Sequence, residues 1–150
     1  MGPAPRGRVG DAGSGSSRVI AADTSVLVRY LVGTPVAQAR QAARLIDDDN
    51  LEIGISPVAL AECAHVLRTQ YEVPPRDVID SLIDLVQREN IRMLGLSTEL
   101  VVQHLVLARS MPGRPIPDAL IVAAAVAGNA ESLVTFDREQ ARYGIPIRTP

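Results

Sequence analysis

Four acidic side chains stand at positions where carboxylates could share a metal ion. Asp23 follows the apolar segment VIAA and Asp137 follows LVTF, so each is expected at the carboxyl end of a strand, while Asp118 and Glu62 belong to helical segments. Carboxylates that are packed together raise one another's pKa, and a bound divalent cation removes that conflict. Oxygen ligands without cysteine suit Mg²⁺, or else Mn²⁺, far better than zinc. Such a cation lowers the pKa of a bound water, so the chemistry that these residues could perform is metal-assisted hydrolysis.

For three of these acids, helix capping is an alternative explanation to metal binding. An Asp near a helix start accepts hydrogen bonds from free backbone N–H groups, which would suit Asp23, Asp118 and Asp137. Asp137 is followed by Gln140 three residues later, which fits a capping box. Arg114 could pair with Asp118 through the turn before its helix. Capping predicts scattered acids that serve their own helices, whereas a metal site predicts acids that meet.

Glu62 has no such local explanation, because it lies about two turns inside a helical segment. Its neighbours at helical spacing include Val58, Ala59 and Val66, and none of them is an arginine. Burying an unpaired carboxylate costs several kcal/mol unless the charge is paired, protonated or bound to a cation. We therefore expect Glu62 to stand among apolar side chains and to join the other acids.

The acids can meet only if the fold brings the ends of distant elements together. The predicted strands are residues 18–22, 51–56, 91–96, 132–136 and 145–149. The predicted helices are about 25–31, 36–47, 57–71, 75–88, 97–109, one from about 117 and a short one from 137. Ser56 and Ser97 are predicted as N-cap residues, and Pro57 as a first helical residue. This alternation indicates an α/β fold with a central, mostly parallel sheet of about four to five strands and helices on both faces. If the first and fourth strands lie close, Asp23 and Asp137 share the rim where such sheets bind ligands.

Length and composition indicate a single domain. The chain has 150 residues, of which 47% are hydrophobic, enough for one independent core. Residues 1–17 are rich in Gly, Pro and Ser and are expected to form a disordered extension, so the domain covers 18–150. The uncharged run 119–127 predicts a helix buried on nearly every side. It is too short to span a membrane, and no apolar signal segment precedes the domain, so we expect a cytoplasmic protein with no membrane partner.

The inventory of side chains excludes several kinds of chemistry. Cys63 is the single cysteine, so neither an internal disulfide nor a cysteine zinc site can form. All fifteen basic residues are arginine, which excludes lysine-dependent phosphate loops, Schiff bases and phosphoaspartyl sites. Aromatic residues make up only 3% of the chain, too few for a base-stacking platform. Contact with a nucleic acid would depend on the metal and on nearby arginines, for which Arg109, Arg114, Arg138 and Arg142 are the candidates.

The four acids and their surroundings resemble a known family. The segments VIAADTSVLVRYL, ISPVALAE, PDALIVAAA and LVTFDR are similar to the four acidic motifs of the PIN domain. The order of motifs and the length are similar to those of VapC-type ribonuclease toxins of bacterial type II toxin–antitoxin pairs. The resemblance covers about residues 18–150 and assigns Asp23, Glu62, Asp118 and Asp137 to the active site. It implies that Asp23 and Asp118 are the direct Mg²⁺ ligands.

Two positions depart from the family pattern. Ser25 stands where many relatives have Asn, although its hydroxyl could serve the same hydrogen bond, and Phe136 precedes the fourth acid where polar residues are frequent. His65 and His104 have no metal-binding spacing around them, and ordinary surface or helix-face roles are expected for both.

The resemblance implies an Mg²⁺-dependent endoribonuclease that is the toxin of a toxin–antitoxin pair. Its partners would be the RNA substrate, a second copy of the chain in a homodimer and a cognate antitoxin lying in an apolar groove. The helical segments SVLVRYLV and VAQARQAARLI have apolar stripes that could line such a groove, or could simply pack into the core. Two alternatives stay open at this point. One is a solitary PIN-fold RNA-processing nuclease, and the other is a non-catalytic PIN-like binding module.

Overall fold

A three-stranded parallel sheet forms one part of the fold. The structure is a computed structural model that describes residues 18–150; the predicted disordered extension over residues 1–17 lies outside the described residues. The strands are β1 (Val19–Ala21), β2 (Glu52–Ile55) and β3 (Ile91–Met93), in the order β1-β2-β3. β2 is central, and Ile53 pairs with Ile20 on one side and Ile91 on the other. Parallel neighbours must be joined by crossover helices, which is why a helical pair follows each of the first two strands.

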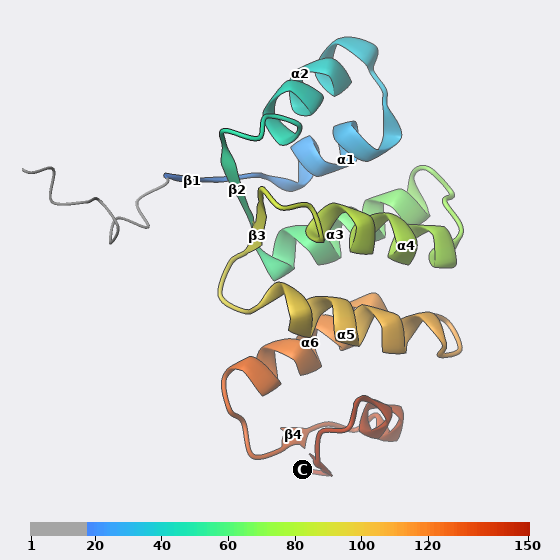
Figure 1. Ribbon diagram of the computed structural model, residues 1–150. Coiled ribbons are helices and arrows are strands. Elements are labelled where there is room, and N and C mark those ends of the chain that lie inside the picture. The colour runs from blue at the N-terminus through green and yellow to red at the C-terminus, as the bar shows by residue number, and fades with distance from the viewer. Residues whose placement is uncertain (1–17) are drawn as a thin grey trace, which may run out of the picture.

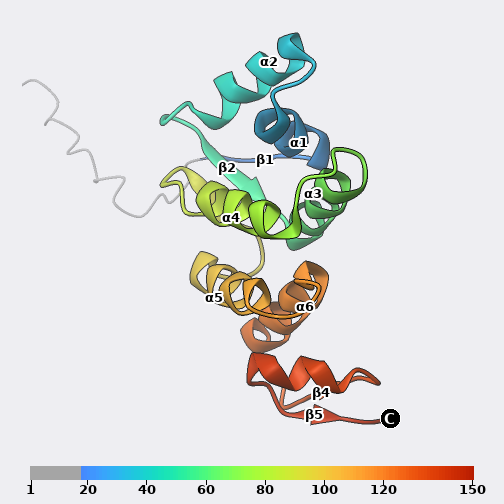
Figure 2. The same cartoon turned by 90° about the vertical axis from the view of Figure 1, so that its right-hand side faces the viewer.

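Four helices surround this sheet. They are α1 (Thr24–Val32), α2 (Val36–Ile46), α3 (Pro57–Thr69) and α4 (Pro75–Val86). Figures 1 and 2 show α1 and α2 on one side of the sheet and α3 and α4 on the other. α1 also packs directly against α3, so the two helices that carry the first two acidic motifs are neighbours.

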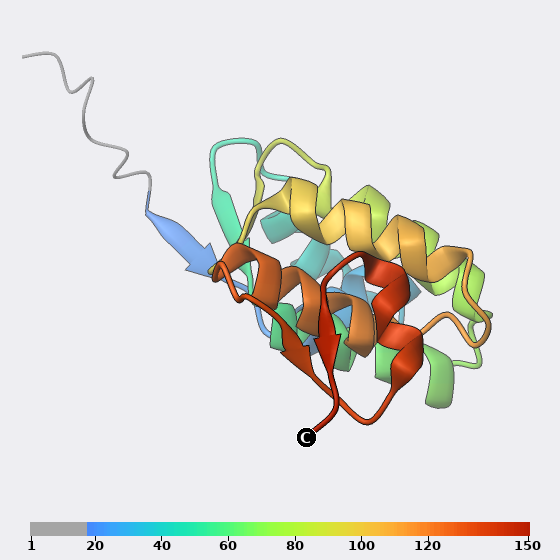
Figure 3. The ribbon, with the colours of Figure 1, turned by 90° about the horizontal axis from the view of Figure 1, so that it is seen from below.

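The remaining elements extend the fold away from the first sheet. α5 (Thr98–Arg109) packs on α4, and α6 (Ile116–Ala127) packs on α5 and α3. Beyond them lie β4 (Leu133–Val134), the 3₁₀ helix η1 (Arg138–Tyr143) and β5 (Ile147–Arg148). Seen from below, β4 and β5 lie in front of the α5–α6 pair, next to η1 (Figure 3). The layers therefore run from α1 and α2 through the first sheet and four further helices to a second, smaller sheet.

The predicted α/β class with parallel strands and helices on both faces is confirmed, with one difference in the strand order. The five strands do not form one central sheet, because β4 pairs with β5 in a separate two-stranded parallel sheet. The backbone N–H groups of Leu133 and Thr135 donate to the carbonyl oxygens of Pro146 and Arg148, at 2.8 and 2.9 Å. The α5–α6 pair stands between β4 and β1 (Figures 1 and 2), so the first and fourth strands do not share a rim.

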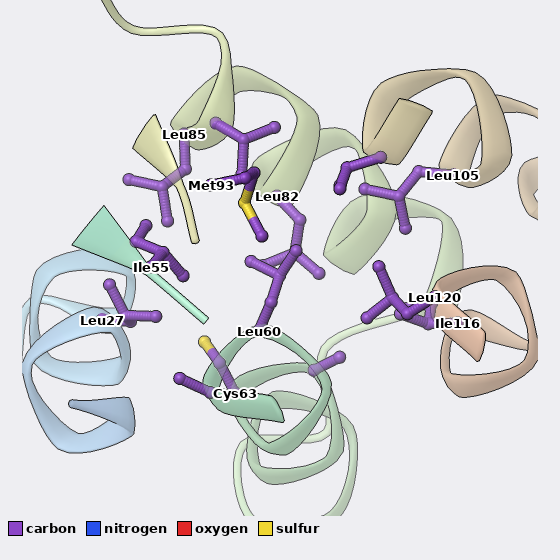
Figure 4. Packing of buried hydrophobic residues seen from close by; sticks show 14 of the residues in the cluster. Leu27, Ile55, Leu60, Cys63, Leu82, Leu85, Met93, Leu105, Ile116 and Leu120 are labelled. Atoms are coloured by element: carbon purple, nitrogen blue, oxygen red, sulfur yellow. The ribbon is translucent and has the colours of Figure 1, made fainter. Parts of the chain in front are cut away.

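A continuous apolar core connects these layers. Leu27, Ile55 and Leu60 are fully buried around the first sheet, and Leu105 and Ile116 continue the core between the lower helices (Figure 4). Over residues 18–150, none of the helices combines the length and the apolar character that a membrane-spanning segment requires.

Cys63 belongs to this core as a packing residue. It is free and fully buried, and burial raises the pKa of its thiol to about 12. The thiolate form that reacts with other groups is therefore suppressed at neutral pH.

The expectation that α6 is buried on nearly every side is wrong. Its inner side is fully buried at Ala119, Val122 and Ala123, but Ile121 is 50% exposed and Val126 is 38% exposed. The neighbouring layers cover only one side of the helix. The lack of charge in a segment does not by itself require burial, since apolar atoms form much of any protein surface.

The start of α3 shows how the sequence defines a helix boundary. Ser56 is the N-cap residue and its hydroxyl accepts a hydrogen bond from the N–H of Ala59 at 3.0 Å, while Pro57 occupies the first helical position. Both roles were predicted. Replacing Ser56 with Ala leaves that N–H without its partner, and we expect the free energy of unfolding to fall by about 1 kcal/mol. Urea denaturation measures this loss, and Ser56→Asp, which restores an acceptor, should recover most of it.

Candidate active site

The four predicted site residues fall into two pairs. Asp23 and Glu62 line a shallow hollow of about 230 Å³ between α1 and α3. Asp118 and Asp137 line a second hollow of about 370 Å³ between α6 and η1. Within residues 18–150, no group of three or more His, Cys, Asp or Glu side chains is arranged to hold a metal ion. The expected meeting of all four acids in one pocket is therefore not found, because β4 delivers Asp137 to the second sheet rather than to the edge of β1.

Hydroxyl groups from α1 hold the first pair. Asp23 occupies the N-cap position of α1 but makes no side-chain capping bond there. Instead, the hydroxyl of Ser25 donates to Oδ2 of Asp23 at 3.3 Å, so Ser25 makes the hydrogen bond that the sequence suggested for it. The buried hydroxyl of Thr24 donates to Oε2 of Glu62 at 3.2 Å. Consecutive residues of one helix turn therefore orient the two carboxylates.

The expected burial of Glu62 is wrong. Its side chain is exposed, although Ala59 and Cys63 on the same helix are buried. The apolar residues at helical spacing divide between two sides of α3, and Glu62 lies on the side that faces the hollow. Solvent and the Thr24 hydroxyl stabilise its charge, so burial does not force it to bind a cation.

The second pair lies in a less polar environment. Asp118 is the third residue of α6, is half-buried and makes no capping hydrogen bond. Burial and the neighbouring charge of Asp137 together raise the pKa of the Asp118 carboxyl above its ordinary value. The side-chain amide of Gln140 donates to Oδ1 of Asp118 at 3.4 Å. Two like charges thus share a hollow, which is the electrostatic conflict that the sequence predicted for these acids.

Asp137 caps η1 and also lies in the hollow that it shares with Asp118. Its Oδ1 accepts a hydrogen bond from the N–H of Glu139 at 2.9 Å, so it caps η1. The capping box with Gln140 does not form, because the Gln140 side chain turns to Asp118 instead. Capping uses one carboxylate oxygen of Asp137, and no hydrogen bond within the described residues engages its Oδ2.

The arginines predicted to flank the site differ in whether they are already bound to a carboxylate. Arg109 binds Asp80 on α4 at 2.6 Å, and Arg142 binds Glu139 at 2.8 Å. The alternative pairing of Arg114 with Asp118 does not form, since neither residue takes part in an ion pair within residues 18–150. Arg114 adopts a positive φ of 45° in the turn before α6. No positive charge within that part of the chain therefore neutralises the Asp118–Asp137 pair through a direct contact.

Sequence reasoning missed the residues that support Asp118. Tyr143 is buried, and its hydroxyl donates to the carbonyl oxygen of Pro115 at 3.2 Å, which fastens the turn before α6. Burial, with the charges of Asp118 and Asp137, raises the pKa of Tyr143 to about 12, so this hydroxyl stays protonated at neutral pH. His104 is buried and stacks on the Tyr143 ring with the centroids 6.0 Å apart, a helix-packing role. These two contacts join residues 28 and 39 positions apart, so local sequence patterns do not reveal them.

Carboxylates beyond the carboxyl ends of strands lie where parallel α/β folds bind ligands, and carboxylate oxygens can hold a divalent cation. Comparison with known proteins gives the family of the chain. The sequence model of the PIN domain family matches residues 20–146, and the chain therefore belongs to the PIN domain family, a nuclease superfamily. No curated protein matched the chain.

Proposed function

We propose that the protein is an Mg²⁺-dependent endoribonuclease and the toxin of a VapC-type toxin–antitoxin pair that acts in the cytoplasm. The observation that carries the proposal is the Asp118–Asp137 pair, two carboxylates that share one hollow and bind no arginine within residues 18–150. A purely structural acid is normally paired, hydrogen-bonded in full or solvated. A half-buried carboxylate whose pKa is raised by burial and by a neighbouring like charge is instead typical of a functional site.

The donor set fits Mg²⁺, or Mn²⁺ in its place. Mg²⁺ keeps several waters and is commonly bound by one or two carboxylates together with substrate phosphates. The direct ligands implied by the resemblance, Asp23 and Asp118, line separate hollows, so in our proposal Asp118 and Asp137 supply the two carboxylates. Within residues 18–150, no cysteine or histidine that would favour zinc lines their hollow. When bound, the cation lowers the pKa of a water and neutralises charge on the scissile phosphate.

Other residues of the chain would hold the carboxylates in place, and one carboxylate would accept a proton. The Gln140 amide orients the Asp118 carboxylate, and the Tyr143–Pro115 hydrogen bond fixes the turn from which α6 starts. The solvated carboxylates of Asp23 and Glu62, held by Ser25 and Thr24, complete the catalytic set in our proposal. Asp137 would accept the proton of the attacking water, since Glu62 lines a separate hollow.

The proposed antitoxin would bind between α1 and α2. These helices enclose a hollow of about 500 Å³ lined by both apolar and polar side chains, among them Val26, Leu45 and Gln38. Such a hollow suits an amphipathic peptide segment. We also propose that the chain forms a homodimer.

Metal dependence tests the proposed activity. The purified chain, incubated with a mixture of end-labelled RNAs, should cleave in Mg²⁺ or Mn²⁺ and stop cleaving when EDTA is added in excess. Because a ligand that binds only the folded state stabilises it, Mg²⁺ at about a hundred times its Kd should add about 2.7 kcal/mol to the free energy of unfolding. Thermal unfolding with and without Mg²⁺ measures that gain. Cleavage that persists unchanged in EDTA would contradict the proposal, as would a chain that neither cleaves any RNA nor is stabilised by either cation.

A further inference from the structure

A third hollow lies between the two acidic ones, and it is basic. It has a volume of about 340 Å³ and lies where α3 packs against the start of α6. His65, Arg68 and Thr69 of α3 provide its polar lining, and Ile116 and Pro117 of α6 close the other side. Among the residues that the structure describes, no carboxylate lines this hollow.

Its position follows from the spacing along the two helices. Glu62 and Val66 on α3 and its C-cap residue Gln70 recur at four-residue intervals and line the hollow of Asp23. His65 and Arg68 lie on the adjacent side of the same helix. On α6, Pro117 borders the basic hollow, and the next residue, Asp118, borders the second acidic hollow. The basic hollow therefore lies between the two carboxylate pairs.

The charge of Arg68 is available to a ligand. Its side chain is exposed, and within residues 18–150 it forms no ion pair or hydrogen bond, in contrast to Arg88, Arg109 and Arg142, which all bind carboxylates. His65 is likewise exposed and forms no side-chain hydrogen bond in that part of the chain. An arginine donates through a planar fork that matches phosphate oxygens. The N-terminal end of α6, on the opposite wall, adds a positive helix dipole.

We propose that this hollow binds a backbone phosphate of the RNA, next to the phosphate that is cleaved. The proposal rests on the proposed ribonuclease function and adds to it a substrate contact and its residues. A strand that crosses both acidic hollows carries one negative charge per nucleotide and would be repelled by four carboxylates. Arg68 supplies the positive charge that holds the strand between them, while the His65 ring can donate a hydrogen bond and the start of α6 adds its helix dipole. Because the contact is made to phosphate, it contributes affinity without base preference.

Binding of RNA in the absence of divalent metal tests this assignment separately from cleavage. Fluorescence anisotropy with a labelled single-stranded RNA of about 20 nucleotides in EDTA should show that Arg68→Ala weakens binding about three- to tenfold. The slope of log affinity against log salt should become less steep by about 0.7, the value for one lost phosphate contact on a single strand. Arg68→Lys should keep most of the slope, and Arg68→Glu should weaken binding more than Arg68→Ala does. Since Arg68 is exposed, thermal unfolding should be nearly unchanged in all three variants.

Arg40→Ala is the matched control. Arg40 is exposed on α2, forms no ion pair within the described chain and lines none of the three hollows, so its removal changes the net charge equally. Its variant should bind RNA almost as the unmodified protein does. Equal losses in Arg68→Ala and Arg40→Ala, or none in either, would overturn the inference. If the unmodified chain still cleaves RNA with Mg²⁺ in that case, the proposed function stands and only the phosphate site fails; if it neither binds nor cleaves RNA, both fail.

Discussion

Asp118→Asn should abolish Mg²⁺-dependent RNA cleavage without lowering the melting temperature. The substitution keeps the shape of the side chain and removes the charge that would hold the cation, so we expect a loss of at least about a hundredfold in cleavage rate. It also removes the repulsion between this carboxylate and Asp137. The variant should therefore unfold at the same temperature as the unmodified protein or slightly higher at neutral pH. Gel-based RNA cleavage and thermal unfolding measure the two effects on one preparation.

The pH dependence of stability gives a further test of the same residue. The pKa of Asp118 is raised in the folded protein, so the folded state binds this proton more tightly than the unfolded state does. Its contribution to stability is fully present below the ordinary aspartate pKa and is lost as the pH rises through the folded pKa. The stability difference between Asp118→Asn and the unmodified protein should thus appear above that pKa and vanish in acid.

Asp84→Asn provides the control for this substitution. Asp84 is an exposed residue of α4 that forms no ion pair or hydrogen bond within residues 18–150. The same chemical change there should leave both cleavage and melting temperature unaltered. Cleavage at the normal rate by Asp118→Asn would disprove the assignment of this residue to the metal site.

The elements of the fold could be predicted where the signal is local. Ser56 and Ser97 cap α3 and α5 as expected, because an N-cap depends on residues within one turn. The strands were located from short apolar runs for the same reason. The pairing of β4 with β5, apart from β1, was not predicted, because alternation of strands and helices does not determine which strands become neighbours.

In the site, too, contacts between residues close in the sequence could be predicted, and contacts between distant residues could not. The hydrogen bond from Ser25 to Asp23 spans two residues and was anticipated from the motif. The exposure of Glu62 depends on how α1 packs on α3, and the contact of Gln140 with Asp118 spans 22 residues. Periodicity identified which residues share a side of a helix but not whether another element covers that side. Sequence reasoning therefore found the acids, and the tertiary packing decided how they are paired.

Leu60→Ala should cause the largest loss of stability of the substitutions considered for this chain. Leu60 is fully buried near the start of α3 and lies at the centre of the core (Figure 4). Truncating such a leucine removes buried apolar surface and leaves a cavity, which costs about 2–5 kcal/mol. That is a large part of the total stability of about 5–15 kcal/mol typical of a domain. Urea denaturation should show a lower midpoint with an unchanged slope.

The effect of Leu60→Ala on cleavage should differ in kind from that of Asp118→Asn. Leu60 lines neither acidic hollow, so below its own melting temperature the variant should cleave RNA at nearly the normal rate. Val58→Ala is the matched control, because Val58 lies two residues earlier on the same helix but is 75% exposed. Its cost should stay within about 0.5 kcal/mol. Loss of cleavage by folded Leu60→Ala would contradict this separation and would mean that the position of α3 in the core, and with it Glu62, controls the chemistry directly.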